Sequence, residues 1–150
     1  NEIFNEISQK GGLTPSRKVK EIGERFPDKV AFRYKEFGIW TEITYKEFWD
    51  QVQYVGNALK FYGVNVGETV AVHSENRPEW IISDVGIQAI QSITVGLYPT
   101  NPPQEVKYLL GHSEAKILFA EDQEQVKQQN ENEAPMIRGV CFCRRRLPSW

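Results

Sequence analysis

The stretch that decides the fold is ETVAVHSENRPEWIISDVGIQAIQSITVGLYPT, residues 68–100. It contains two apolar runs, 69–73 and 93–98, and each run is too short for a helix. Between them, Pro78 stands where a first helical residue is expected, and residues 80–90 are apolar on nearly every side. The stretch therefore predicts a strand, a helix and a second strand.

The same alternation continues toward the C-terminus. A short helix is predicted over 104–110, where Gly111 would close it, followed by a third apolar run over 116–120 and a polar helix over 121–129. Strands without alternating polar residues are typical of a parallel sheet that is covered on both faces. The predicted fold class is therefore α/β, with a partial doubly wound parallel sheet of the form βαβαβ.

A leader, a helix and a hairpin are predicted at the start of the chain. Residues 1–15 are expected to be a loose leader, because a glycine pair and Pro15 break any periodicity. A short amphipathic helix is predicted over 16–26. Two strands, 29–34 and 39–43, should then form a hairpin that turns through Phe37 and Gly38.

The clearest predicted helix follows this hairpin. Thr44 and Glu47 have the spacing of a capping box, in which each side chain satisfies a backbone N–H of the first turn. Apolar residues then recur at steps of three and four on one face: Phe48, Val52, Val55, Leu59 and Tyr62. Gly63 is placed to end the helix in a left-handed cap.

Composition narrows the functional classes. The chain has 150 residues, 18 basic and 20 acidic side chains, a formal net charge of −2 and 40% hydrophobic residues. These totals fit about one folded domain and give no reason to expect binding to nucleic acid or to an anionic membrane. The two cysteines, Cys141 and Cys143, are too close for an unstrained disulfide. A disulfide-stabilised secreted protein is thus excluded, and a reducing intracellular compartment is expected.

No sequence motif for binding phosphate is present. The sequence has neither G-x-G-x-x-G nor G-x-x-x-x-G-K-[ST], and it lacks a Ser/Thr/Gly-rich run. His73 ends an apolar strand, where it could act as a general base, but a hydrogen bond to a neighbouring backbone group is the favoured interpretation. His112 is interpreted as a helix-end cap, and Asp84 as a structural residue in an apolar helix. The carboxylates of 121–124 are assigned to the start of a surface helix, and no zinc site is expected.

Several motifs together resemble a known family. They are SENRPEW at 74–80, VGLYPT at 95–100, HSEAK at 112–116 and TYKEF at 44–48. These residues resemble the N-terminal part of long-chain fatty-acid–CoA ligases, which belong to the adenylate-forming (AMP-binding) superfamily. TYKEF resembles the first core motif of that superfamily, and the resemblance covers about residues 24–127.

The resemblance implies a two-step reaction in the parent enzyme. A long-chain fatty-acid carboxylate attacks the α-phosphate of ATP, with Mg²⁺ offsetting phosphate charge, and coenzyme A then displaces AMP from the acyl-adenylate. The family's phosphate loop, adenine-binding segment, magnesium-binding glutamate and catalytic lysine lie later in a full-length member. We therefore assign no catalytic, cofactor-binding or metal-binding residue here, and expect ATP, Mg²⁺ and coenzyme A not to bind this fragment.

The predicted organisation follows from this resemblance. Residues 1–23 comprise the leader and the start of the first helix, 24–127 the N-terminal part of an AMP-binding domain, and 128–150 a divergent tail. Within that tail, 136–142 could form a further strand, whereas the arginine triplet 144–146 does not fit the family. A frameshift, a retained intron or a truncated gene model would explain such an ending.

The leading hypothesis is an N-terminal ligase fragment without activity of its own. A non-catalytic interaction or regulatory module derived from the ligase is the alternative, and an unrelated nucleotide-binding α/β protein is a third. The expected location is cytoplasmic or the cytoplasmic face of a membrane. The fatty-acid substrate is compatible with peripheral membrane association, and uncovered apolar surface with self-association; nucleic acid is not an expected partner.

Overall fold

The computed structural model describes residues 14–121 and 138–141. Helices and strands follow one another in this order: α2 (Pro15–Arg25), β1 (Val30–Glu36), β2 (Ile39–Thr44), α3 (Tyr45–Phe61), β3 (Thr69–His73), α4 (Pro78–Ala89), β4 (Ile93–Leu97), α5 (Pro103–His112), β5 (Ile117–Ala120) and β6 (Arg138–Cys141). The predicted succession of a helix, a hairpin and alternating strands and helices is confirmed.

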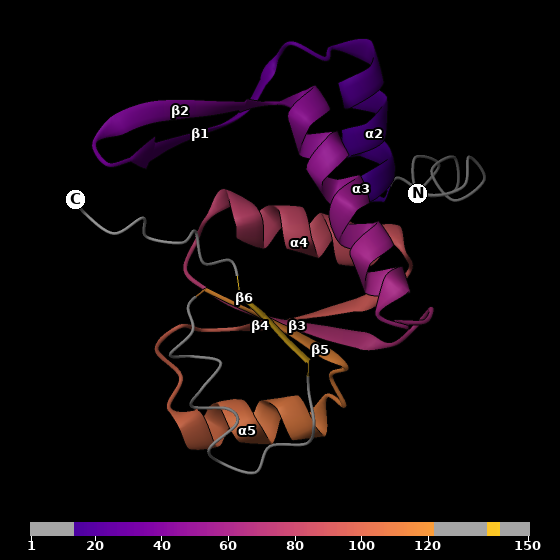
Figure 1. Ribbon diagram of the computed structural model, residues 1–150, viewed down its shortest axis with the longest axis vertical. Coiled ribbons are helices and arrows are strands. Elements are labelled where there is room, and N and C mark those ends of the chain that lie inside the picture. Colours follow the sequence, from indigo (N-terminus) through magenta and orange to yellow (C-terminus); the bar gives the residue numbers. More distant parts are fainter. Residues whose placement is uncertain (1–13, 122–137, 142–150) are drawn as a thin grey trace, which may run out of the picture.

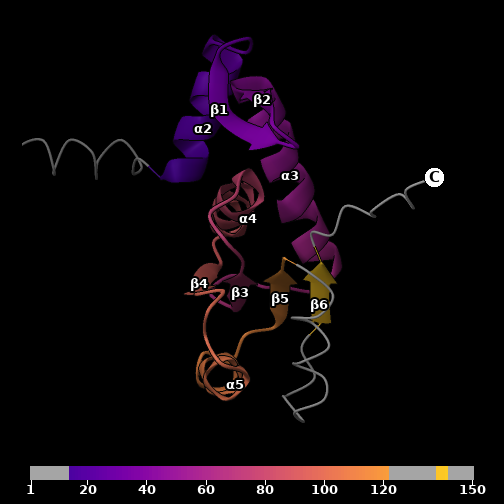
Figure 2. The ribbon, with the colours of Figure 1, turned by 90° about the vertical axis from the view of Figure 1, so that its left-hand side faces the viewer.

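The central sheet has the strand order β4-β3-β5-β6, and its neighbouring strands are parallel. Val70 of β3 pairs with Thr94 of β4 on one side and with Ile117 of β5 on the other. Helix α4 covers one face and α5 covers the opposite face (Figures 1 and 2). The predicted doubly wound α/β fold is therefore confirmed, and its sheet extends to β6.

The alternation of side chains along β3 divides the core into two clusters. Val70 and Val72 face the α3–α4 side, whereas Ala71 faces α5. The α3–α4 cluster consists of Leu59, Val64, Val70, Val72, Ile87, Ile90, Ile117 and Phe119. The α5 cluster consists of Ala71, Leu97, Val106, Leu110, Ala115, Leu118 and Ala120. Burial on both faces explains why these strands carry almost no polar residues.

A third cluster lies on the outer side of α4, where α2, α3 and the hairpin pack together. Its buried members are Phe48, Val52, Ile82 and Val85. The helices approach closely: a Cβ atom on Gly86 of α4 would come within 2.6 Å of Cγ1 of Val55 on α3. Helix α4 therefore contributes side chains to two cores, which explains its nearly uninterrupted apolar sequence.

The hairpin β1–β2 is antiparallel and turns through two residues, as predicted. Glu36 pairs with Ile39, and between them Phe37 and Gly38 both have positive φ, at 48° and 84°. This is the backbone that a tight two-residue hairpin requires. A bulge between Val30 and Phe32 shifts the register near the base.

Helix α3 begins with the predicted capping box. The Thr44 N–H donates to Oε2 of Glu47 at 2.8 Å, and the Glu47 N–H donates to Oγ1 of Thr44 at 3.3 Å. Gly63 follows the helix end with φ of 84°. A glycine in this left-handed conformation ends the helix, as the sequence predicted.

Two local predictions are wrong. Pro15 does not interrupt a leader but is the first residue of α2. The backbone N–H groups of a first helical turn make no hydrogen bond within the helix, so a proline, which has no N–H, is tolerated there. Gly111 does not close α5, which continues to His112. The left-handed residue after this helix is Glu114, with φ of 52°.

The structure describes only part of the two chain ends, so only some of the predictions made for them can be compared with it. A strand was predicted within 136–142 and is present at Arg138–Cys141. Residues 1–13 of the predicted leader and residues 122–129 of the predicted polar helix lie outside the described residues. Across the part of the chain described, no helix combines the length and the apolar character needed to span a bilayer.

Candidate functional site

A pocket of about 450 Å³ opens at the carboxyl ends of β3 and β4. The loop after β3 leads to α4 on one face of the sheet, whereas the loop after β4 leads to α5 on the other. Neighbouring loops that leave in opposite directions open a crevice, which is the usual ligand position in parallel α/β sheets. The topology alone thus places a candidate site here.

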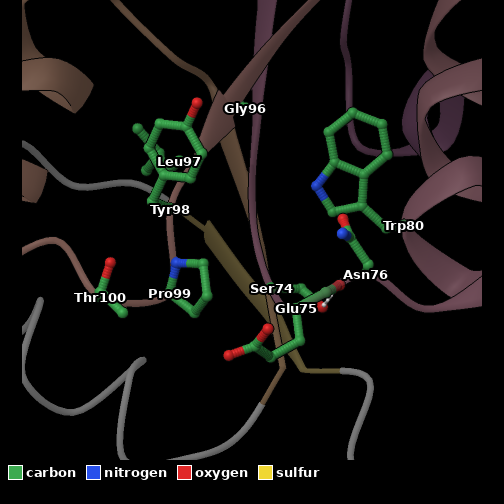
Figure 3. Close-up of a pocket in the computed structure, with 9 residues that line it drawn as sticks. All are labelled: Ser74, Glu75, Asn76, Trp80, Gly96, Leu97, Tyr98, Pro99 and Thr100. Atoms are coloured by element: carbon green, nitrogen blue, oxygen red, sulfur yellow. Dashed lines mark hydrogen bonds between the residues drawn. The ribbon is translucent and has the colours of Figure 1, made fainter.

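Aromatic side chains form two sides of this pocket (Figure 3). Trp80 of α4 lies on one side, and Tyr98 lies on the other with Pro99 and Thr100. Gly96 contributes no side chain, and a Cβ atom there would lie 3.3 Å from Cζ2 of Trp80. The lining is completed by Ser74, Glu75, Asn76 and Leu97. The missing side chain at Gly96 therefore leaves the indole room beside the sheet.

The two loops around the pocket are joined by His73. Its side chain is 4% exposed, and its Nε2 lies 3.0 Å from the carbonyl oxygen of Tyr98. A carbonyl can only accept, so Nε2 carries the proton and donates to it. The favoured interpretation of His73 as a strand-end residue bonded to backbone agrees with this geometry.

Hydrogen bonds to Glu121 hold the loop between β3 and α4 in place. Glu121, just after β5, accepts from the Glu75 N–H and from Nη1 of Arg77, each at 3.0 Å. Arg77 also pairs with Glu79 at 3.3 Å. Burial alone would lower the pKa of Arg77, but its hydrogen bonds to Glu121 and Glu79 outweigh that effect and raise it. The guanidinium thus remains charged and holds the rim of the pocket.

The pocket suits an uncharged group better than a phosphate. Among the described residues that line it, Glu75 is the one carboxylic acid, and none is a lysine or an arginine. A phosphate site needs converging N–H groups or cations to balance negative charge. Two aromatic walls with hydroxyl and amide groups nearby instead provide apolar contact and a few hydrogen bonds.

The described residues offer no carboxylate cluster for Mg²⁺. Among 14–121 and 138–141, no three histidine, cysteine, aspartate or glutamate side chains gather in a way that could hold a metal ion. A hard divalent cation prefers several carboxylate or carbonyl oxygens together with substrate phosphates. We therefore derive no catalytic step through ATP or Mg²⁺ from these residues.

The other singled-out polar residues have structural partners. Asp84 is half-buried and accepts from Nε2 of Gln88 at 2.8 Å. His112 ends α5 and stacks on Tyr108, with ring centroids 5.6 Å apart. Glu121, interpreted from the sequence as the start of a surface helix, instead bonds to the loop before α4. None of these residues lines the 450 Å³ pocket.

The pocket itself was missed from the sequence. SENRPEW and VGLYPT indicated a family resemblance, but their proximity in space was not predicted. The available signal was that both motifs follow parallel strands, whose carboxyl ends lie at one edge of the sheet. The pairing of His73 with Leu97 across β3 and β4 brings the two motifs together.

Sequence comparisons point to one family. A family model described as AMP-binding enzyme matches residues 19–143. The long-chain-fatty-acid–CoA ligase FadD15 of Mycobacterium bovis is 37% identical over 95 residues, which is 63% of this chain and 16% of that protein. The peroxisomal long chain acyl-CoA synthetase 7 of Arabidopsis thaliana is 35% identical over 82 residues, which is 55% of this chain and 12% of that protein. The chain thus spans less than a fifth of the length of these relatives.

Solved structures share the fold. VinN is 21% identical, and the match covers 87% of this chain and 32% of VinN with a TM-score of 0.77. The N-terminal subdomain of NpsA from Klebsiella oxytoca, solved in complex with 3-hydroxybenzoyl-AMSN, is 22% identical. That match covers 85% of this chain and 29% of the subdomain, with a TM-score of 0.68. At these identities the likeness concerns the fold alone.

Proposed function

The chain belongs to the AMP-binding enzyme family, and we propose that it forms part of a long-chain fatty-acid–CoA ligase. The observation that carries this proposal is the family match over 19–143, because it includes the whole sheet and every residue that lines the pocket. The curated relatives named above are ligases or synthetases of long-chain acyl-CoA. The substrate of the complete enzyme would then be a long-chain fatty acid.

The complete enzyme would catalyse two transfers. A carboxylate oxygen of the fatty acid attacks the α-phosphorus of ATP, and the bond to pyrophosphate breaks. The sulfur of coenzyme A then attacks the acyl carbon, and AMP leaves. This chain would supply the parallel sheet, its covering helices and the pocket, whereas the groups that bind phosphate and Mg²⁺ would come from the rest of the enzyme.

A chimaeric enzyme tests the proposal. The segment of the Mycobacterium bovis ligase that aligns with this chain is replaced by the chain's own residues, and formation of palmitoyl-CoA is measured. We expect the chimaera to form palmitoyl-CoA, while a control with the same segment deleted forms none. A folded chimaera that binds fatty acid and ATP but makes no acyl-CoA would contradict the proposal.

The isolated chain is proposed to be inactive. Among the described residues, no cluster of side chains could hold a metal ion, and the described lining of the pocket includes no lysine or arginine that could bind phosphate. We expect no ATP–pyrophosphate exchange above the protein-free blank when purified chain is mixed with palmitate, ATP and Mg²⁺. Exchange that depends on fatty acid and grows with protein concentration would refute this.

A non-catalytic interaction module is the second candidate. Exposed aromatic residues on α3 and just after it favour it, because Tyr54 and Phe61 of the helix are largely exposed and the capping residue Tyr62 partly so. A functional module should be a monomer or a defined oligomer that unfolds cooperatively. A chain that needs the rest of the ligase should instead aggregate or bind a hydrophobic dye. Sedimentation velocity of the original chain and of Phe61→Gln distinguishes these possibilities. A functional module should sediment as one defined species, whereas a chain that needs the rest of the ligase should sediment as aggregates that Phe61→Gln reduces.

A further inference from the structure

The 450 Å³ pocket contains an acid that the rest of the fold does not neutralise. Glu75 is exposed, and among the described residues its carboxylate has neither an ion pair nor a hydrogen bond. In Figure 3 it lies below Trp80 and Tyr98, which stand on opposite sides of the pocket. A ligand that suits this arrangement carries an apolar group with a cation next to it.

Two arginines lie near the pocket, and both are already paired. Arg77 contacts Glu79 at 3.3 Å and Glu121 at 3.0 Å. Arg33, which lines an adjoining pocket, contacts Glu42 at 2.7 Å. The two guanidiniums thus face their own carboxylate partners and leave the acid of the pocket unbalanced. The rim therefore carries a net negative charge, which favours a cationic ligand.

The four strands of the central sheet end in one row. Leu97 of β4 pairs with His73 of β3, His73 with Ala120 of β5, and Ala120 with Cys141 of β6. Neighbouring strands are about 4.8 Å apart, so Cys141 lies about 10 Å from His73 and about 14 Å from Leu97. The chain therefore leaves β6 at the same edge of the sheet as the pocket (Figure 2).

The sequence after β6 has the chemistry that the pocket requires. Residues 144–150 read RRRLPSW, so that a triplet of cations is followed by Leu147, Pro148 and Trp150. This RRRLPSW segment lies outside the described residues and beyond the family match, which ends at residue 143. Residues 142–150 can span about 30 Å when extended, which is more than the distance from Cys141 to the pocket.

We infer that the RRRLPSW segment docks into the 450 Å³ pocket of its own chain. Its guanidiniums pair with Glu75 and the negative rim, and the indole of Trp150 enters between Trp80 and Tyr98, where aromatic rings pack favourably. The short connection to β6 keeps the segment at a millimolar effective concentration, so modest contacts suffice. The docked segment would close the pocket to other ligands. This inference goes beyond the proposed ligase function and does not depend on it.

Fluorine NMR of the full 150-residue chain tests the inference. The tryptophans are replaced by 5-fluorotryptophan, and Trp150→Phe identifies the resonance of Trp150. We expect this resonance to differ from that of a labelled synthetic peptide with the sequence of residues 142–150. Diluting the protein about tenfold should not move it, because docking within one chain does not depend on concentration.

Substitutions in the pocket and in the segment should move the Trp150 resonance toward that of the peptide. Glu75→Gln should lower the ratio of docked to undocked segment about threefold, because it removes an exposed ion pair. Tyr98→Ala should lower the ratio about tenfold, because it removes one aromatic wall. Changing the three arginines together to glutamine should lower it as well, whereas changing them to lysine should largely preserve docking.

The controls separate loss of docking from loss of folding. Glu114→Gln is the matched control, because this exposed acid lies just before β5, at the opposite edge of the sheet from the pocket. It should leave the Trp150 resonance unchanged. Trp49 packs against the core formed by α3, α4 and the hairpin, so its resonance reports in each variant whether the fold is intact. Tyr98 is 76% exposed, so its loss should not disturb that core.

Three outcomes would overturn the inference. The first is a Trp150 resonance that matches the peptide in the original chain. The second is an equal response to Glu114→Gln and Glu75→Gln. The third is a displacement that grows with protein concentration, which would show that the pocket receives the segment of a second copy instead.

Discussion

Gly86 lies at the contact between α3 and α4, where a Cβ atom would come within 2.6 Å of Cγ1 of Val55 and 3.3 Å of the Val52 carbonyl oxygen. Alanine normally favours a helix over glycine by about 1 kcal/mol. At Gly86 the overlap should outweigh that preference, because overpacked sites commonly lose 1–3 kcal/mol. We expect Gly86→Ala to lower the free energy of unfolding in urea by about 1–2 kcal/mol.

Gly111 is the matched control for this substitution. It also lies in a helix, but a Cβ atom added there meets nothing within 4 Å. Gly111→Ala should therefore raise the free energy of unfolding by about 0.5–1 kcal/mol. If both alanines stabilise the chain, the helices are not packed as closely as described.

At the scale of a single element, the start of α3 predicts a dependence of stability on pH. The hydrogen bonds that Glu47 accepts from the Thr44 N–H and then from the Thr44 hydroxyl lower the pKa of Glu47. The unfolded chain therefore takes up a proton at a higher pH than the folded chain. This contribution is complete above the ordinary glutamate pKa of about 4.3 and is lost as pH falls through the lower folded value.

Glu47→Gln tests this effect, because glutamine keeps a hydrogen-bond acceptor but does not titrate. Urea unfolding between neutral and acidic pH should show a steeper acid loss for the original chain than for the variant. Lys18 lowers the pKa of Glu21 in the same direction, so the comparison between the two proteins isolates Glu47. Parallel pH profiles would show that the capping box does not persist in solution.

The elements also show which predictions a sequence supports. The capping box of Thr44 and Glu47 was predictable because both partners lie within one helical turn. The end of α5 was predicted wrongly because glycine is common just after a helix, yet Val106 and Leu110 pack into the core and the chain turns only at Glu114. The contacts of Glu121 with residues 75 and 77 could not be predicted from the sequence. The partners lie 44 to 46 residues apart, and no local pattern relates positions at that separation.

At the scale of the whole molecule, Glu121 connects the end of β5 to the loop before α4. Glu121→Ala would leave the Glu75 N–H and the half-buried Arg77 guanidinium without this acceptor. We expect the free energy of unfolding to fall by about 1–2 kcal/mol. Glu42→Ala removes the partner of Arg33 from an exposed pair and should change it by less than about 0.5 kcal/mol.

Chemical denaturation of the two variants side by side provides the measurement. Equal effects for Glu121→Ala and Glu42→Ala would mean that the bridge at the pocket rim is as weak as a surface pair. The pocket would then lack the support that the structure indicates.

The position of α4 has a consequence for how the molecule opens. Its residue Ile87 and the capping residue Ile90 belong to the core against the sheet, while Ile82 and Val85 belong to the core under the hairpin. Neither layer can separate without exposing one side of the same helix. Backbone amides of β3 and of α3, although in different layers, should therefore exchange with deuterium through one shared cooperative event, and the exposed turn of the hairpin should exchange independently of it.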